Sequence, residues 1–199
     1  DYSNGTCPSL LVEPQRTNLA LQSNSAVNST VNVGYSATDN NTTSPDGTTN
    51  AARVLEDTSA LHLIQKTFSV ATTTTPYSVS FFVKANGRTS GNILYGLNGA
   101  PFSSVFATFN LSNGTITAAV GDSGATAISS SIEDFGNGWF RVSVSGTIPT
   151  AGTHYVRLQD ANGGAAGDPS KGFFVYGFQA EAGSYATSYI PTTSASVTR

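Results

Sequence analysis

The sequence predicts an all-β protein, folded as a single antiparallel β-sandwich. Charged residues make up only 11% of the chain and 20 glycines are spread through it. This composition suits short strands and turns and is poor for amphipathic helices. Segments that alternate apolar with polar residues recur along the chain, separated by Asn-Gly turn signals. We find no internal repeat and no domain boundary, so residues 1–199 are expected to form one domain.

The first predicted element lies in residues 44–57. This segment allows one helical turn, but its Pro-Asp-Gly sequence predicts a turn that is followed by a strand. The clearest strand signal lies at 77–85, where apolar residues alternate with polar ones. Asn113-Gly114 lies between two strand patterns and predicts a hairpin. Many short strands with regular turns predict a sandwich of jelly-roll type. Further strands are expected at 91–98, 104–111, 114–120, 139–146, 153–160 and 172–183.

The two ends of the chain differ from its strand-rich middle. Residues 1–12 are expected to form an N-terminal arm, and the polar residues 184–199 an extended C-terminal tail. Cys7 is the only cysteine, so the chain cannot close an internal disulfide. No methionine occurs, which favours an excised domain or a processed product.

Six segments in chain order carry a family resemblance: "LLVEPQRTNLALQS" at 10–23, "SPDGTTNAARVLED" at 44–57, "YSVSFFVKA" at 77–85, "ATFNLSNGTI" at 107–116, "IEDFGNGWFRVSVS" at 132–145 and "GFQAEAGSYATSYIPTTSASVTR" at 177–199. Together they resemble jelly-roll domains found in bacteriophage head-fibre and tail-associated proteins. Similar domains are attached to bacterial secreted or surface proteins. The plan is also similar to that of a class of carbohydrate-binding modules.

That resemblance implies an extracellular or virion-associated protein with a non-catalytic adhesive or structural role. It implies a fold and no single ligand. The chain departs from the family at Tyr176, where members usually carry tryptophan, and at Phe178, where they carry a small residue. It departs again at 24–33, which is polar where the family has an acidic and aromatic segment.

The alternation of side chains between the two faces of each predicted strand predicts a ligand-binding surface. Alternation within 139–145 places the phenylalanine and the valines in the core, and Trp139 and Arg141 on the other face. The same alternation in 153–160 and 77–85 leaves a ring and a cation on the non-core face of each strand. The predicted ligand-binding residues are Trp139, Arg141, Tyr155, Arg157, Gln159, Phe82 and Lys84.

Rings, cations and small hydroxyls on one surface are typical of glycan recognition. Aromatic rings stack on the apolar face of a pyranose, and rigid side chains lose little entropy on binding. The arginines favour an acidic polysaccharide, because a guanidinium fork fits carboxylate or sulfate. In the alternative interpretation, Trp139 caps the edge of the sandwich and the arginines are ordinary solvated residues.

Glu13 and Glu181 are the predicted metal ligands, for a structural calcium ion. The related jelly-roll binding modules often hold calcium between the first segment and the last strand, which are the segments that carry these two glutamates. Calcium prefers several oxygen ligands, including carboxylates. The alternative is that Glu13 forms an ion pair with an arginine.

Composition and motifs argue against other classes of function. A net charge of −3 argues against nucleic acid as a partner, and no apolar run is long enough to cross a membrane. The acidic residues lie mostly in turns, and no Gly-x-Ser-x-Gly elbow or metal-spaced histidine and cysteine cluster occurs. We therefore expect no catalytic residues and no enzyme.

The sequence thus favours a non-catalytic carbohydrate-binding or adhesion module of a larger phage or bacterial extracellular protein. Its partner would be a polysaccharide or a cell-surface glycan. The alternative is a structural or decoration domain of a virion without sugar recognition, which would form a homo-oligomer if it belongs to a fibre. A polysaccharide-degrading enzyme is the third class, and it would need two converging carboxylates or a His–Tyr–Arg cluster in a groove.

Overall fold

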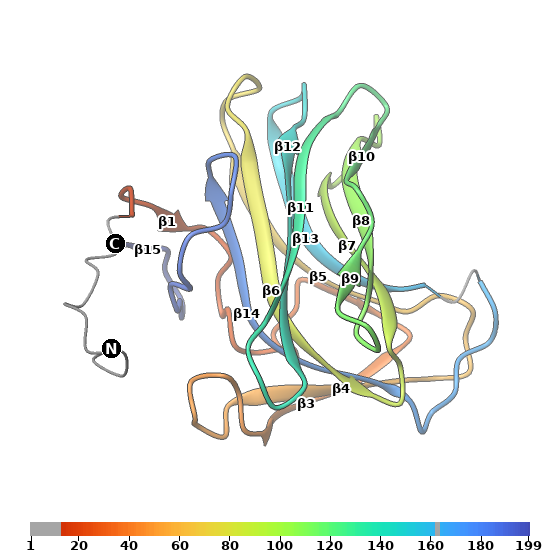
Figure 1. The fold of residues 1–199 in the computed structure, drawn as a ribbon. Helices are drawn as coiled ribbons and strands as arrows, with labels where there is room; N and C mark the ends of the chain where they lie inside the picture. Colours follow the sequence, from red (N-terminus) through yellow and green to blue (C-terminus); the bar gives the residue numbers. More distant parts are fainter. Residues whose placement is uncertain (1–12, 162–163) are drawn as a thin grey trace.

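The computed structural model describes residues 13–161 and 164–199, and the all-β prediction is confirmed there. These residues form strands and turns, with no helix among them. Two antiparallel sheets pack face to face as a sandwich (Figure 1). The jelly-roll subtype stays a prediction.

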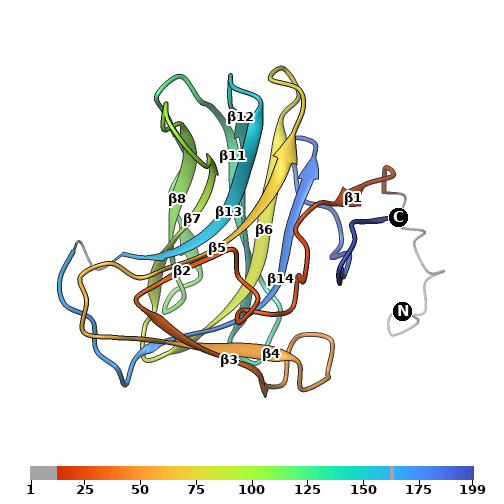
Figure 2. The same cartoon turned by 180° about the vertical axis from the view of Figure 1, so that it is seen from behind.

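The first sheet has six strands in the order β11-β12-β6-β14-β4-β3. The second has seven and runs β10-β8-β7-β13-β5-β2, with β9 paired to β8. A separate ribbon joins β1 to β15, beside β14 (Figure 2). The strands are β1 (Thr17–Asn18), β2 (Val31–Val33), β3 (Tyr35–Thr42), β4 (Ala51–Glu56), β5 (Leu63–Val70), β6 (Tyr77–Asn86), β7 (Ser90–Leu97), β8 (Ser104–Asn110), β9 (Thr115–Ile116), β10 (Val120–Asp122), β11 (Thr126–Asp134), β12 (Trp139–Thr147), β13 (Gly152–Asp160), β14 (Gly172–Ala182) and β15 (Val197–Thr198).

The core lies between the two sheets, and alternation predicted correctly which side of three strands enters it. Phe81 of β6 packs against Phe109 of β8, in the opposite sheet, with ring centres 6.4 Å apart. On β13 the core-facing positions His154, Val156 and Leu158 are fully buried, and the His154 Nδ1 atom lies 2.8 Å from the Tyr95 hydroxyl. The outward residues of β6, β12 and β13 are therefore the ones available for other contacts.

Several strands differ from the sequence prediction. The segment 44–57 contains β4 and no helical turn, whereas the expected strand 114–120 is divided between β9 and β10. Strand β5 was not predicted because polar residues interrupt its apolar pattern. One of them, Lys66, is only 2% exposed, and its ammonium donates to the carbonyl of Asn28 at 3.1 Å.

The C-terminal segment, residues 183–199, covers part of the outer face of the six-stranded sheet. The backbone amide of Ile190 donates to the Gln179 side-chain oxygen at 2.7 Å, and the Ser145 hydroxyl donates to the Ser184 carbonyl at 2.7 Å. Outward polar residues of β12 and β14 are therefore buried beneath this segment. The expected arm 1–12, with Cys7, lies outside the described residues. In the described part of the chain, no helix has the length and hydropathy needed to span a membrane.

Candidate functional site

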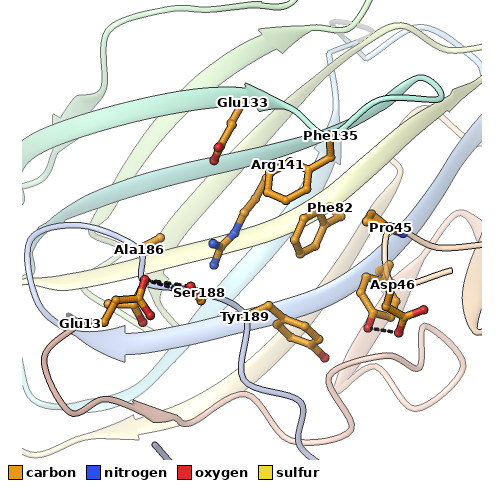
Figure 3. Close-up of a pocket in the computed structure, with 12 residues that line it drawn as sticks. Glu13, Pro45, Asp46, Phe82, Glu133, Phe135, Arg141, Ala186, Ser188 and Tyr189 are labelled. Atoms are coloured by element: carbon orange, nitrogen blue, oxygen red, sulfur yellow. Dashed lines mark hydrogen bonds between the residues drawn. The ribbon is translucent and has the colours of Figure 1, made fainter. Parts of the chain in front are cut away.

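A hollow of about 450 Å³ opens on the outer face of the six-stranded sheet. Its floor comes from β6, β12 and β14, and the turn before β12 and the segment 43–50 form part of its rim. The C-terminal segment supplies the remaining wall through Ala186, Thr187, Ser188 and Tyr189. Figure 3 shows the Arg141 guanidinium between the rings of Phe82 and Phe135 on one side and Glu13, Ala186 and Ser188 on the other.

Aromatic rings form one half of this hollow. The Phe82 ring packs edge-on against Phe135 at 4.9 Å and against Tyr189 at 6.0 Å, and Tyr176 lies 5.7 Å away. Phe82 itself is only 4% exposed, whereas Phe135 is 43% exposed. Phe135 is therefore the ring that a ligand can reach most readily, and Phe82 supports it from below.

Arg141 is the cation of the hollow, and part of its hydrogen-bonding capacity is unused. The side chain is 8% exposed and its guanidinium lies 5.4 Å from the centre of the Phe82 ring. Its Nη2 donates to the Ser80 hydroxyl at 3.0 Å, while its buried Nε has no acceptor among the described residues. Burial lowers the pKa of Arg141, and neighbouring carboxylates, first Glu181 and then Glu133, act in the opposite direction.

Three carboxylates line the hollow, and two of them are already hydrogen-bonded. Burial alone would raise the pKa of Asp46, but the hydrogen bonds that its carboxylate accepts outweigh this effect and lower the pKa. The largest of these contributions comes from the Tyr176 hydroxyl, which donates at 2.7 Å. Glu13 accepts from the amide and hydroxyl of Ser188 at 2.9 Å, and these bonds likewise lower its pKa against the effect of burial. The Glu133 carboxylate has no ion pair or hydrogen bond within the described structure.

Arg141 and Phe82 both line the hollow, and their role in ligand binding stays a prediction, whereas Trp139 is buried and does not line it. The indole is 2% exposed and packs with Phe82, Tyr176 and Ala51 beneath the segment 43–50. Its Nε1 donates to the Thr43 carbonyl at 3.0 Å. The prediction that Trp139 forms a contact surface is therefore wrong, because the segment before β4 covers it.

Lys84 stands beside this cluster without entering the hollow. It is the cross-strand partner of Trp139 and is half-buried. A Cβ atom added to Gly138 would come within 3.6 Å of its aliphatic stem. The lysine stem therefore packs against the turn that precedes β12.

The other predicted ligand residues lie on the far side of the molecule. Tyr155, Arg157 and Gln159 belong to β13, in the middle of the seven-stranded sheet, and point away from the core. The Arg157 guanidinium stacks 4.2 Å from the Tyr155 ring, and its Nε and Nη2 both donate to Gln65. The prediction of a single surface is therefore wrong, because parity assigns a face within a strand but not the sheet to which the strand belongs.

The two predicted calcium ligands are occupied by protein donors. Glu181 is fully buried and accepts from the amide and hydroxyl of Thr187 at 2.8 and 2.7 Å and from the Gln179 amide at 2.8 Å. Glu13 is additionally bound by the Arg199 guanidinium at 2.6 Å, as the ion-pair alternative expected. Calcium at these two residues stays a prediction.

A different group, Glu56, His62 and Asp160, could hold a metal ion. Their ligand atoms lie within 4.8 Å of one another, at one end of the sandwich. His62 Nδ1 lies 2.7 Å from Asp160, and Arg88 binds both oxygens of Glu56 at 2.6 and 2.7 Å. The adjacent guanidinium would compete with a cation for the carboxylate. No sequence spacing pointed to this group, because Asp160 lies 98 residues after His62 in the chain.

No protein-family model matches the chain, and no curated protein is significantly similar to it.

Proposed function

We propose that the protein is a non-catalytic carbohydrate-binding module and that the hollow around Arg141 is its sugar site. The observation that carries this proposal is the Arg141 guanidinium, which lines the hollow and donates a single side-chain hydrogen bond, to Ser80, beside an exposed ring, Phe135. Sugar recognition combines stacking on such a ring with hydrogen bonds from fixed polar groups. Following the family resemblance, we place the module in a larger extracellular or virion-associated protein.

The charges of the hollow favour a neutral sugar over the acidic polysaccharide expected from the sequence. Glu13 is paired with Arg199, which leaves Glu133 and Asp46 as negative charges and Arg141 as the positive one. An anionic ligand would meet repulsion from these two carboxylates as well as attraction from the guanidinium. A neutral sugar can donate hydroxyl hydrogens to the carboxylates and accept from the arginine.

The lining carboxylates also support binding over catalysis. Glycoside hydrolysis needs a general acid whose pKa is raised. The pKa values of Glu13 and Asp46 are lowered by their hydrogen-bond donors. The proposal includes no calcium ion, since the protein itself provides donors to the predicted ligands.

Affinity electrophoresis in gels that contain neutral or acidic polysaccharides tests this function. We expect retention of the wild-type protein by at least one neutral polysaccharide and loss of retention in Phe135→Ala and Arg141→Gln. The matched control is Arg157→Gln, which makes the same change on the opposite sheet and should leave retention intact. A properly folded wild-type protein that no polysaccharide retains would refute the proposal and favour a purely structural role.

A further inference from the structure

A second, smaller hollow adjoins the first on the same outer face. It has a volume of about 170 Å³ and is lined mainly by serines of β11 and β12, with Tyr185 at its rim. Glu133, Arg141 and Ala186 line both hollows. The two hollows therefore meet at these three residues and form one elongated groove, which we call the β12 groove.

Two oppositely charged residues that form no salt bridge with each other lie at the boundary between the hollows. Glu133 and Arg141 are direct cross-strand partners on β11 and β12. Such a pair would ordinarily be expected to form a salt bridge, yet no contact within 4.0 Å joins them. Arg141 is held instead by the Ser80 hydroxyl and by the ring of Phe82. The Arg141 guanidinium, whose one side-chain hydrogen bond goes to Ser80, and the Glu133 carboxylate, which has no salt bridge, thus both line the centre of the groove.

The second hollow has a low, hydroxyl-bearing floor. The lining hydroxyls of Ser131 and Ser143 lie 2.7 Å apart across β11 and β12. The hydroxyl of Ser129, which also lines the hollow, lies 2.8 Å from that of the buried Ser145. Short side chains leave room for a ligand above the sheet, and hydroxyls can both donate and accept. Tyr185 is 53% exposed. The hollow therefore offers a second aromatic side chain beyond the charged pair.

We infer that the β12 groove binds a linear, neutral polysaccharide across at least two consecutive sugars. This inference rests on the proposed function of the first hollow. One sugar occupies the aromatic hollow, and the next lies over the serine floor towards Tyr185. Glu133 and Arg141 bind sugar hydroxyls on both sides of the linkage that joins the two sugars. The groove continues past the first sugar, so it suits an internal stretch of a chain as well as its end.

Calorimetric titration with oligosaccharides of increasing length tests the inference, using fragments of a neutral polysaccharide that the wild-type protein retains. We expect the affinity to rise about tenfold from one sugar to two or three, which corresponds to about 1.4 kcal/mol. Tyr185→Ala should remove most of this gain and leave the affinity for the single sugar unchanged. Ser143→Gln, which fills the second hollow, should do the same.

The controls separate this inference from the proposed function. Equal affinity for one sugar and for longer chains would overturn the second subsite and leave the sugar site intact. An equal loss for short and long ligands in Tyr185→Ala would also overturn it, because the tyrosine would then support the fold of the site. An acidic polysaccharide that binds more tightly than its carboxyl-reduced form would overturn the neutral class. Absence of all binding would refute the proposed function itself.

Discussion

The hydroxyl of Tyr176 donates a 2.7 Å hydrogen bond to the carboxylate of Asp46, and this bond ties the segment before β4 to the middle of β14. The two residues are 130 positions apart in the chain. Asp46 also accepts hydrogen bonds from its own turn, through the amide and hydroxyl of Thr48 at 2.8 and 2.7 Å. The turn is thus locally ordered, and the tyrosine attaches it to the sheet at the rim of the proposed sugar site.

Removing this bond should weaken both the fold and the site. Tyr176→Phe is expected to lower the free energy of unfolding by about 1 kcal/mol, at the low end for a bond to a charged group because Asp46 is partly exposed. Sugar affinity should fall several-fold, since the rim is no longer fixed. Urea unfolding and gel retention measure the two effects. Tyr185→Phe is the control for stability, because the Tyr185 hydroxyl has no hydrogen bond within the described structure.

The stabilisation that ionised Asp46 provides should depend on pH. Folding lowers the pKa of Asp46 below its ordinary value of 3.8, so its contribution is complete above that pH and is lost as the pH falls from there through the lowered pKa. The difference in unfolding free energy between wild type and Asp46→Asn, which carries no ionisable group at this position, should therefore shrink below about pH 4. Urea titrations at pH 7 and pH 3 measure it. A difference that stays constant or grows towards pH 3 would contradict the role given to Asp46.

Trp139 should matter for stability and not for ligand contact. Trp139→Phe removes buried aromatic surface and the hydrogen bond to Thr43, and we expect a loss of about 2 kcal/mol in unfolding free energy. Below the unfolding transition the variant should keep its sugar affinity to within a few-fold. Unchanged stability together with lost binding would show that the indole touches the ligand after all.

Arg141 should behave in the opposite way. Replacing an unpaired buried cation by an apolar side chain of similar length removes a desolvation cost. Arg141→Met is therefore expected to be as stable as the wild type or more stable, while it loses retention by the polysaccharide. Denaturant midpoints and gel mobility measure the two properties. A large loss of stability in this variant would mean that the guanidinium is needed to hold the fold.

Removal of metal ions by a chelator tests whether either acidic group, Glu13 with Glu181 or Glu56 with His62 and Asp160, holds a structural ion. Protein donors already satisfy Glu13 and Glu181, and Arg88 occupies the Glu56 carboxylate of the Glu56–His62–Asp160 group. We expect EDTA to leave the Tm unchanged, and added calcium or zinc to leave it unchanged as well. A fall of several degrees in EDTA that either metal reverses would establish a structural ion. Glu181→Gln and His62→Gln would then locate it.

Part of the site could be predicted from the sequence because it depends on local geometry. Successive side chains of a strand point to opposite faces, so the apolar halves of β6 and β12 identified Phe82 and Arg141 as residues outside the main core. The hairpin at Asn113-Gly114 was likewise predicted, and β8 pairs with β9 across residues 111–114, where Gly114 has a positive φ of 64°. Serine-rich β11 lacks an apolar pattern of this kind and was missed, although it supplies Glu133.

Only the tertiary structure decided which of these outward faces could form a site. It placed β13 in the other sheet, which separates Tyr155 and Arg157 from Arg141 by the whole thickness of the sandwich. It also folded the C-terminal segment over β14, so that Tyr189 completes the hollow. These outcomes depend on the order of strands in each sheet and on contacts between distant segments. The alternation of residues within a single strand carries no information about either.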